Sequence, residues 1–100
     1  MKKNEQVKSY EQLKGECAPV FYKEVEKFFA KGMLVFVGRD LDIIHVAEVI
    51  AQDDTQQIQQ WIAQEQLTRV HDDFAKKWSK NNEPLLAITA VPWVLVQEFD

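Results

Sequence analysis

Residues 41–52 would place apolar side chains around most of the circumference of an α-helix. The polar positions of this stretch fall on one narrow stripe, formed by Asp42, His45, Glu48 and Gln52. A helix with so little polar surface is stable when other elements cover it. We therefore predict a central buried helix that begins after Asp40, a favourable N-cap residue, with the other elements packed around it.

Three apolar, β-prone stretches could form the sheet that covers this helix. Residues 33–37 are apolar throughout and lie between two glycines, which is typical of a buried strand. Residues 67–70 form a short candidate strand, and residues 85–97 form a longer, bent one that is almost wholly apolar. Because Pro92 cannot donate a ladder hydrogen bond, we predict a bulge or a sheet edge at that position.

The remaining segments show helical periodicity. Apolar residues recur at three- and four-residue steps over residues 7–17, and a second helix is predicted to begin near Pro19 and to end at Gly32. A glutamine-rich helix is predicted over residues 55–66. A short helix capped by Asp72 or Asp73 precedes the last strand.

The predicted elements describe a single small α+β domain over residues 1–100, with about five helices and a short three-stranded sheet. A strand before a two-helix unit, with two strands after it, is also the order of a winged helix-turn-helix. The order therefore suggests a winged-helix-like topology. Such an analogy does not by itself assign a function.

The charges are distributed unevenly along the chain. Residues 1–31 carry seven Lys and five Glu, whereas residues 40–68 carry six carboxylates and neither Lys nor Arg. An anionic middle segment would repel a phosphate backbone, so nucleic acid is not an expected partner.

The sequence favours a cytoplasmic protein without membrane contact. No apolar run approaches the roughly 20 residues of a membrane span, and no apolar signal segment follows the charged N-terminus. Cys17 is the only cysteine and cannot form an internal disulfide. A single thiol suits the reducing cytoplasm.

Several short motifs occur in a distinctive order and spacing. They are Phe28-Phe29-Ala30-Lys31-Gly32, Asp40-Leu41-Asp42, Val46-Ala47, Trp61, Ala75-Lys76-Lys77-Trp78 and Pro92-Trp93-Val94-Leu95-Val96-Gln97. In this arrangement they resemble the small bacterial proteins of the domain-of-unknown-function family 2288. The resemblance covers nearly the whole chain, and the last motif is its most specific part. It implies a bacterial source and adds no activity, cofactor or partner.

A metal site is one chemical hypothesis. Asp42, His45 and Glu48 lie three residues apart on one helix face and offer oxygen and nitrogen ligands. A complete site needs ligands from a second element, for which His71 and the two aspartates after it are candidates. Because no recognised ligand spacing joins these groups, we predict no metal and no cofactor, and we interpret the stripe as solvated surface.

A catalytic cysteine is a second hypothesis, in which Cys17 would pair with His45 or His71 as nucleophile and base. The thiol lies in phase with Leu13 on an apolar helix face, as a buried cysteine does. Its flanking sequence matches no catalytic cysteine signature, and the glycines form no phosphate-binding loop. We therefore predict no catalytic residues.

The candidate interaction residues come from two segments. They are Gln57, Gln60, Gln64, Pro92 and Trp93. The glutamines would form an exposed helix face whose amides bond water or a partner, and an aromatic on an edge strand can dock a protein. Core packing is nevertheless favoured for the tryptophan. The predicted core residues are Ile44, Ala47, Ile50, Trp61 and Trp93.

The sequence favours a non-enzymatic protein-interaction or regulatory module. Its expected partner is another protein, and a homodimer is compatible with the sequence. The alternative is a winged-helix-like DNA-binding regulator, although the candidate recognition helix at residues 55–66 has no Lys or Arg to meet phosphates. A small enzyme with an unrecognised site is the third hypothesis.

Overall fold

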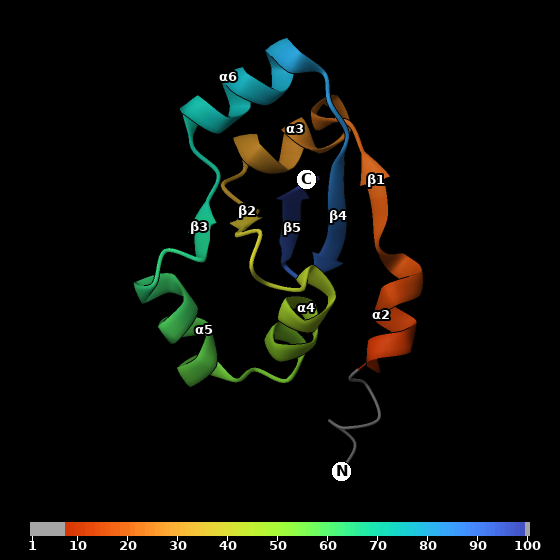
Figure 1. Ribbon diagram of the computed structural model, residues 1–100, viewed down its shortest axis with the longest axis vertical. Coiled ribbons are helices and arrows are strands. Elements are labelled where there is room, and N and C mark those ends of the chain that lie inside the picture. The colour runs from red at the N-terminus through yellow and green to blue at the C-terminus, as the bar shows by residue number, and fades with distance from the viewer. Residues whose placement is uncertain (1–7, 100) are drawn as a thin grey trace.

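The apolar stretches form one mixed sheet with helices on both of its faces (Figure 1), in a computed structural model that describes residues 8–99. The helices are α2 (Tyr10–Glu16), α3 (Tyr22–Ala30), α4 (Ile43–Ala51), α5 (Thr55–Ala63) and α6 (Asp72–Asn81). The strands are β1 (Ala18–Val20), β2 (Leu34–Val37), β3 (Leu67–Arg69), β4 (Leu85–Ala90) and β5 (Trp93–Glu98). The predicted α+β architecture is confirmed.

The sheet has five strands in the order β1-β4-β5-β2-β3. β2 runs parallel to β5, with Leu34 opposite Val94, and the other neighbours are antiparallel. The prediction of three strands was therefore wrong, and residues 8–99 show no winged-helix topology. In residues 8–99, none of the helices has the length and apolar character that crossing a membrane requires.

Successive side chains of a strand point to opposite faces of the sheet and pack in two separate cores. Leu95 packs with residues of α2, α4 and α5 on one face, whereas its neighbour Val96 packs with residues of α3 and α6 on the other. Both side chains are fully buried. This alternation is the reason that the last strand is apolar at nearly every position, since it is covered on both faces.

The central helix is confirmed as α4, and its buried residues are Ile43, Val46, Ala47 and Val49. Its N-cap is Asp42 rather than Asp40, since the Asp42 carboxylate accepts a hydrogen bond from the Ile44 amide at 2.9 Å. Among the predicted core residues, Ala47 and Trp61 are buried. The other predicted core residues are half-buried at the margin of the same cluster: Ile44, Ile50 and Trp93.

Two prolines lie in different structures from those predicted. Pro19 is in β1, and α3 begins only at Tyr22. An edge strand tolerates a residue without an amide proton, so this proline does not need to start a helix. Residues 85–97 form two strands, and Pro92 follows a cis peptide bond in the turn between them rather than at a bulge or edge.

The end of β5 is joined to both layers by polar side chains. Gln97 is buried, and its Nε2 donates hydrogen bonds to the carbonyl oxygens of Gly38 and Leu41 at 2.8 and 2.7 Å. Glu98 Oε2 accepts hydrogen bonds from Lys77 Nζ at 2.9 Å and from Trp78 Nε1 at 3.0 Å. These contacts fix the loop before α4 and the second half of α6 on the sheet.

The contribution of Glu98 to stability should depend on pH. Burial alone would raise the pKa of this carboxyl, but the hydrogen bonds from Lys77 and Trp78 and the nearby positive charges lower it overall. A lowered folded pKa gives stability that is complete above the ordinary glutamate pKa of about 4.3 and is lost as the pH falls through the folded pKa. We expect Glu98→Gln to destabilise the protein at pH 7.

Urea unfolding of the wild type and of Glu98→Gln at several pH values measures this contribution. The difference in unfolding free energy should narrow as the pH drops from about 5 to about 3. A difference that stays constant over that interval would show that the Glu98 charge does not stabilise the fold.

Candidate functional site

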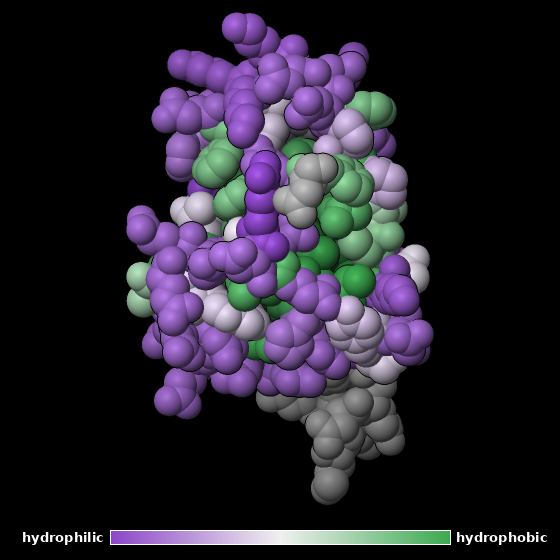
Figure 2. Space-filling view, in the orientation of Figure 1, coloured by the Kyte–Doolittle hydropathy of each residue, from purple (hydrophilic) through white to green (hydrophobic). Residues whose placement is uncertain are grey.

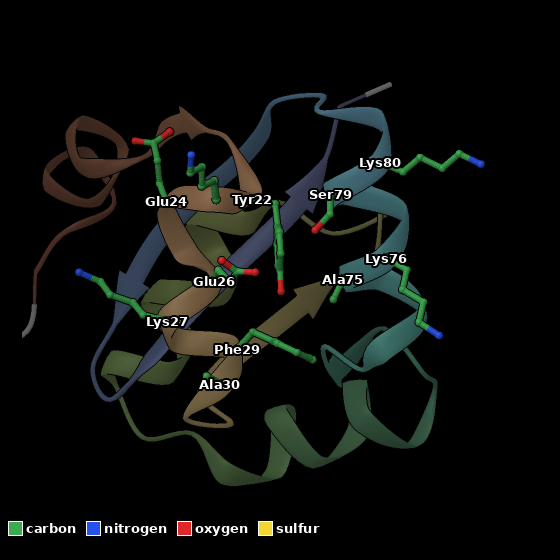
Figure 3. Close-up of a pocket in the computed structure, with 11 residues that line it drawn as sticks. Tyr22, Glu24, Glu26, Lys27, Phe29, Ala30, Ala75, Lys76, Ser79 and Lys80 are labelled. Atoms are coloured by element: carbon green, nitrogen blue, oxygen red, sulfur yellow. The ribbon is translucent and has the colours of Figure 1, made fainter.

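α3 and α6 pack against each other on one face of the sheet and leave an open groove of about 1120 Å³ between them (Figure 3). Its uncharged lining residues, here called its floor, are Tyr22, Phe29, Ala30, Ala75 and Ser79. Its α3 side carries Lys23, Glu24, Glu26 and Lys27, and its α6 side carries Lys76 and Lys80. The groove joins segments that lie about fifty positions apart in the sequence.

Helical spacing explains why the lysines border this groove. Lys23 and Lys27 lie four residues apart on α3, and Lys76 and Lys80 are spaced likewise on α6, so each pair shares one side of its helix. All four side chains are exposed. In Figure 3, Lys27 extends outward on one side of the groove, and Lys76 and Lys80 extend outward on the other.

The acidic residues of the groove balance this charge only in part. Glu24 Oε2 accepts a hydrogen bond from the Phe21 amide at 2.8 Å, so this carboxylate caps the start of α3. Glu26 is the other acid among the lining residues, and the α6 side has none. Figure 2 shows the hydrophilic side chains that cover α6. The groove therefore has a net positive rim on a protein of net charge −4.

Tyr22 gives the floor a polar group without a protein partner. Its residue surface is only 4% exposed, and its ring lies 6.0 Å from the Trp78 ring and 6.3 Å from the Phe29 ring. Figure 3 shows its hydroxyl pointing into the space between α3 and α6. This hydroxyl makes no hydrogen bond with any of residues 8–99. No buried side-chain nitrogen or oxygen within residues 8–99 lacks a hydrogen-bond partner, so this hydroxyl is open to water, and the groove offers a solvent-facing donor.

The Tyr22 hydroxyl is protonated at neutral pH. Burial raises its pKa, and the negative charges of Glu26 and Asp72 raise it further. The group can therefore donate a hydrogen bond to an acceptor in the groove. The residues that line the groove include neither His nor Cys, so among the described residues it has a binding surface without an evident nucleophile–base pair.

The structure does not assemble the metal candidates predicted from the sequence. Asp42 caps α4 and also accepts a hydrogen bond from the Tyr10 hydroxyl, while His45 Nδ1 lies 3.1 Å from Glu48 Oε1. His71 is the N-cap residue of α6, in the place predicted for Asp72 or Asp73, and α6 packs on the opposite face of the sheet. Within residues 8–99, no three His, Cys, Asp or Glu side chains gather to hold a metal ion.

Cys17 is the C-cap residue of α2 and is half-buried against the core that contains α4. Burial raises the pKa of its thiol, and the negative charge of Asp42 raises it further. Because the thiolate is the reactive form, this environment makes Cys17 a poor nucleophile.

We expect Cys17 of the folded protein to react with a thiol-specific reagent at least about tenfold more slowly at pH 8 than the same residue in denaturant, since both access and thiolate fraction are reduced. A colorimetric thiol assay with and without guanidinium chloride measures the two rates. Equal rates, or a faster rate in the folded protein, would contradict this assignment and restore the catalytic hypothesis.

The predicted interaction residues lie outside the groove. Gln57 and Gln60 are on α5, with Gln57 Nε2 donating to Gln60 Oε1 at 3.4 Å, and Gln64 is the C-cap residue of that helix. Pro92 is exposed in the turn between β4 and β5. Trp93 is half-buried, and the Arg69 guanidinium lies 5.3 Å from its ring centroid. Their role in binding stays a prediction.

The comparisons with known proteins agree with the motifs seen in the sequence. The model of the family described as "Protein of unknown function (DUF2288)" matches residues 8–98. The solution NMR structure of PA1075 from Pseudomonas aeruginosa matches with a TM-score of 0.81 and 36% identity, over 91% of this chain and 84% of that one. No curated protein matches the chain. The resemblance inferred from the motifs is thus confirmed, and the chain belongs to the DUF2288 family.

Proposed function

We propose that this protein is a non-enzymatic, cytoplasmic interaction module whose groove between α3 and α6 binds an acidic segment of another protein. The observation that carries the proposal is the pairing of two lysine-bearing rims with an unpartnered Tyr22 hydroxyl on the floor between them. Carboxylates are the complementary groups for both features, because they attract ammonium groups and accept hydrogen bonds.

The lysine-bearing rims of the groove favour a partner of negative charge. The charged groove residues of α6 are Lys76 and Lys80, and those of the α3 rim are Lys23 and Lys27 with Glu24 and Glu26, so the rims are positive overall. Exposed lysines contribute mainly to the rate of encounter and to specificity, and their effect is screened by salt. Binding should therefore weaken as the ionic strength rises.

The floor of the groove favours an apolar side chain between the carboxylates of the partner. Phe29, Ala30 and Ala75 offer apolar surface, and the Tyr22 ring lies among them. An apolar side chain of the partner would cover this surface, while a neighbouring carboxylate of the partner accepts a hydrogen bond from the Tyr22 hydroxyl. Interfaces commonly combine an apolar centre with a charged rim in this way.

The distribution of charge also favours one face of the molecule for binding an acidic partner. α4, α5 and their connections carry six carboxylates over residues 40–68 and neither Lys nor Arg, so an acidic partner is repelled there. These helices cover the opposite face of the sheet from α3 and α6. The acidic partner therefore has one favourable face.

Fluorescence anisotropy with a labelled ten-residue peptide tests the proposal. The peptide alternates Asp and Glu around a central Leu, and a matched peptide carries Asn and Gln instead. We expect saturable binding of the acidic peptide only. Lys76→Glu/Lys80→Glu should weaken it roughly tenfold or more, since it reverses the charge of one whole rim. Tyr22→Phe, which removes only the hydroxyl, should weaken it about threefold to tenfold.

The matched control is Lys8→Glu/Lys14→Glu, which makes the same change in net charge near α2, and it should retain the wild-type affinity. Equal losses in both double variants would show a general charge effect and would contradict binding in the groove. Absence of binding to the acidic peptide at about 0.05 M salt would reject the proposal, since screening is weak under that condition.

A further inference from the structure

The walls of the groove between α3 and α6 consist entirely of helix. Among residues 8–99, all those that line it lie in one of these two helices, and none comes from a strand or a loop. At one end the start of α3 meets the second half of α6, since the Tyr22 ring lies 6.0 Å from the Trp78 ring. Figure 3 shows Phe29 and Ala30 toward the other end. The groove therefore runs along both helices and is not bordered by a sheet edge.

A segment that binds in this groove must satisfy its own backbone hydrogen bonds. The amides and carbonyls of the two walls are paired within their helices, and the carbonyl oxygens of Lys27, Phe29 and Trp78 accept hydrogen bonds from amides at the helix ends. The floor adds only the hydroxyls of Tyr22 and Ser79. An extended segment gains its affinity by pairing with a strand edge, whereas a helix keeps its backbone bonds within itself. These walls therefore favour a helical partner.

The floor has short side chains at the positions that a third helix would approach. Ala30 and Ser79 are exposed, and Ala75 is half-buried. Figure 3 shows Ala75 and Ser79 on the side of α6 that faces α3. Packed helices have axes about 8–10 Å apart, and the side chains at the contact set this distance. Small residues at these positions allow a helix to lie against both walls at once.

The lysines of the two rims repeat with the spacing of a helical turn. Lys23 and Lys27 lie four residues apart on α3, and Lys76 and Lys80 lie four residues apart on α6. Carboxylates four residues apart on a partner helix have the same separation, about 5–6 Å. α3 has nine residues, so about two to three turns of a partner helix span the groove. The charges therefore match a helix that carries acids on both sides of an apolar stripe.

We infer that the partner binds this groove as an acidic amphipathic helix, which packs as a third helix beside α3 and α6. Its apolar residues recur at three- and four-residue steps and cover the floor. Its carboxylates flank this stripe and meet the lysines of both rims, and one of them accepts a hydrogen bond from the Tyr22 hydroxyl. This inference rests on the proposed function and adds the conformation and the residue pattern of the partner.

Two peptides of about 15 residues, a length that is only partly helical when free, test the conformation. The helical peptide has Leu at three- and four-residue steps, Glu on both sides of this stripe and Ala on its outer face. In the broken peptide a central outer Ala is replaced by Pro, which interrupts the helix and keeps every Leu and Glu. In fluorescence anisotropy the helical peptide should bind at least about tenfold more tightly, and far-UV circular dichroism should show a gain of helix on binding. Equal affinities, or binding without a gain of helix, would overturn the inference.

A variant of the floor tests the close approach of the helix. Ser79→Trp should weaken binding of the helical peptide roughly tenfold or more, because a bulky side chain separates the helices. Gln60→Trp, on the exposed side of α5, is the matched control and should keep the wild-type affinity. Unchanged binding to Ser79→Trp would contradict packing on the floor.

The inference and the proposed function fail in different ways. If both peptides bind equally and both lose affinity in Lys76→Glu/Lys80→Glu, the groove binds acidic segments and the helical partner is rejected. If neither peptide binds at about 0.05 M salt, where screening is weak, both are rejected.

Discussion

Replacing Trp78 with alanine is expected to lower the free energy of unfolding by about 4 kcal/mol. The residue is 3% exposed, and its ring lies 5.2 Å from that of Phe74 and 6.2 Å from that of Phe36. Truncation would remove these contacts and leave a cavity under α6. It would also remove the hydrogen bond from the indole nitrogen to Glu98. A small domain has a total stability of about 5–15 kcal/mol, so this loss is large.

Chemical denaturation followed by circular dichroism measures the loss. Trp78→Phe is the matched variant, because it keeps an aromatic ring and most of the buried volume but removes the five-membered ring that carries the indole donor. It should cost about 1–3 kcal/mol. A loss below about 1 kcal/mol for Trp78→Ala would contradict the packing described for α6, since truncation of an enclosed aromatic costs more than that.

Replacing Gln97 with leucine is expected to cost about 2–3 kcal/mol. The side chain fills a buried position, and its amide group donates to two backbone carbonyls in the connection between β2 and α4. Leucine occupies similar space but donates no hydrogen bond. The Leu41 carbonyl would then lose this donor in a partly buried site, whereas the Gly38 carbonyl keeps the bond from the Leu41 amide.

Gln97→Glu provides the control for this prediction. A carboxylate at this position would face two carbonyl oxygens and would be repelled unless it were protonated. The Gln97→Glu variant should therefore be less stable than Gln97→Leu at pH 7 and should recover part of the difference as the pH falls. Urea unfolding at pH 5 and pH 7 compares them. Wild-type stability in both variants would show that the amide is not a structural donor.

Local sequence patterns predicted the helices better than the sheet. The segment that became α4 is apolar on most sides, and this property alone identified it as central. The parallel pairing of β2 with β5 places Leu34 opposite Val94. These residues are far apart in the sequence, so no local pattern predicts the contact. The turn between β4 and β5 was missed because it contains neither Gly nor Asn, the usual signals of a hairpin.

The groove was not predicted because it depends on tertiary packing. The basic character of residues 1–31 was visible, and so was the four-residue spacing of Lys76 and Lys80. Nothing in either segment indicated that α3 and α6 lie together on one face of the sheet. The Tyr22 hydroxyl was equally hidden, because a periodic apolar pattern assigns the whole residue to the core and does not reveal an unpartnered polar end.

The most direct test of groove binding is an NMR titration of isotope-labelled protein with the acidic peptide. The account predicts that the largest amide shift changes occur along α3 and α6, at residues such as Tyr22, Ala75 and Ser79. The amide signals of α4 and α5 should not shift. The shift changes along α3 and α6 should reverse when salt is added. Shift changes centred on α4 and α5, or none at a peptide concentration of about 1 mM, which detects even weak binding, would contradict it.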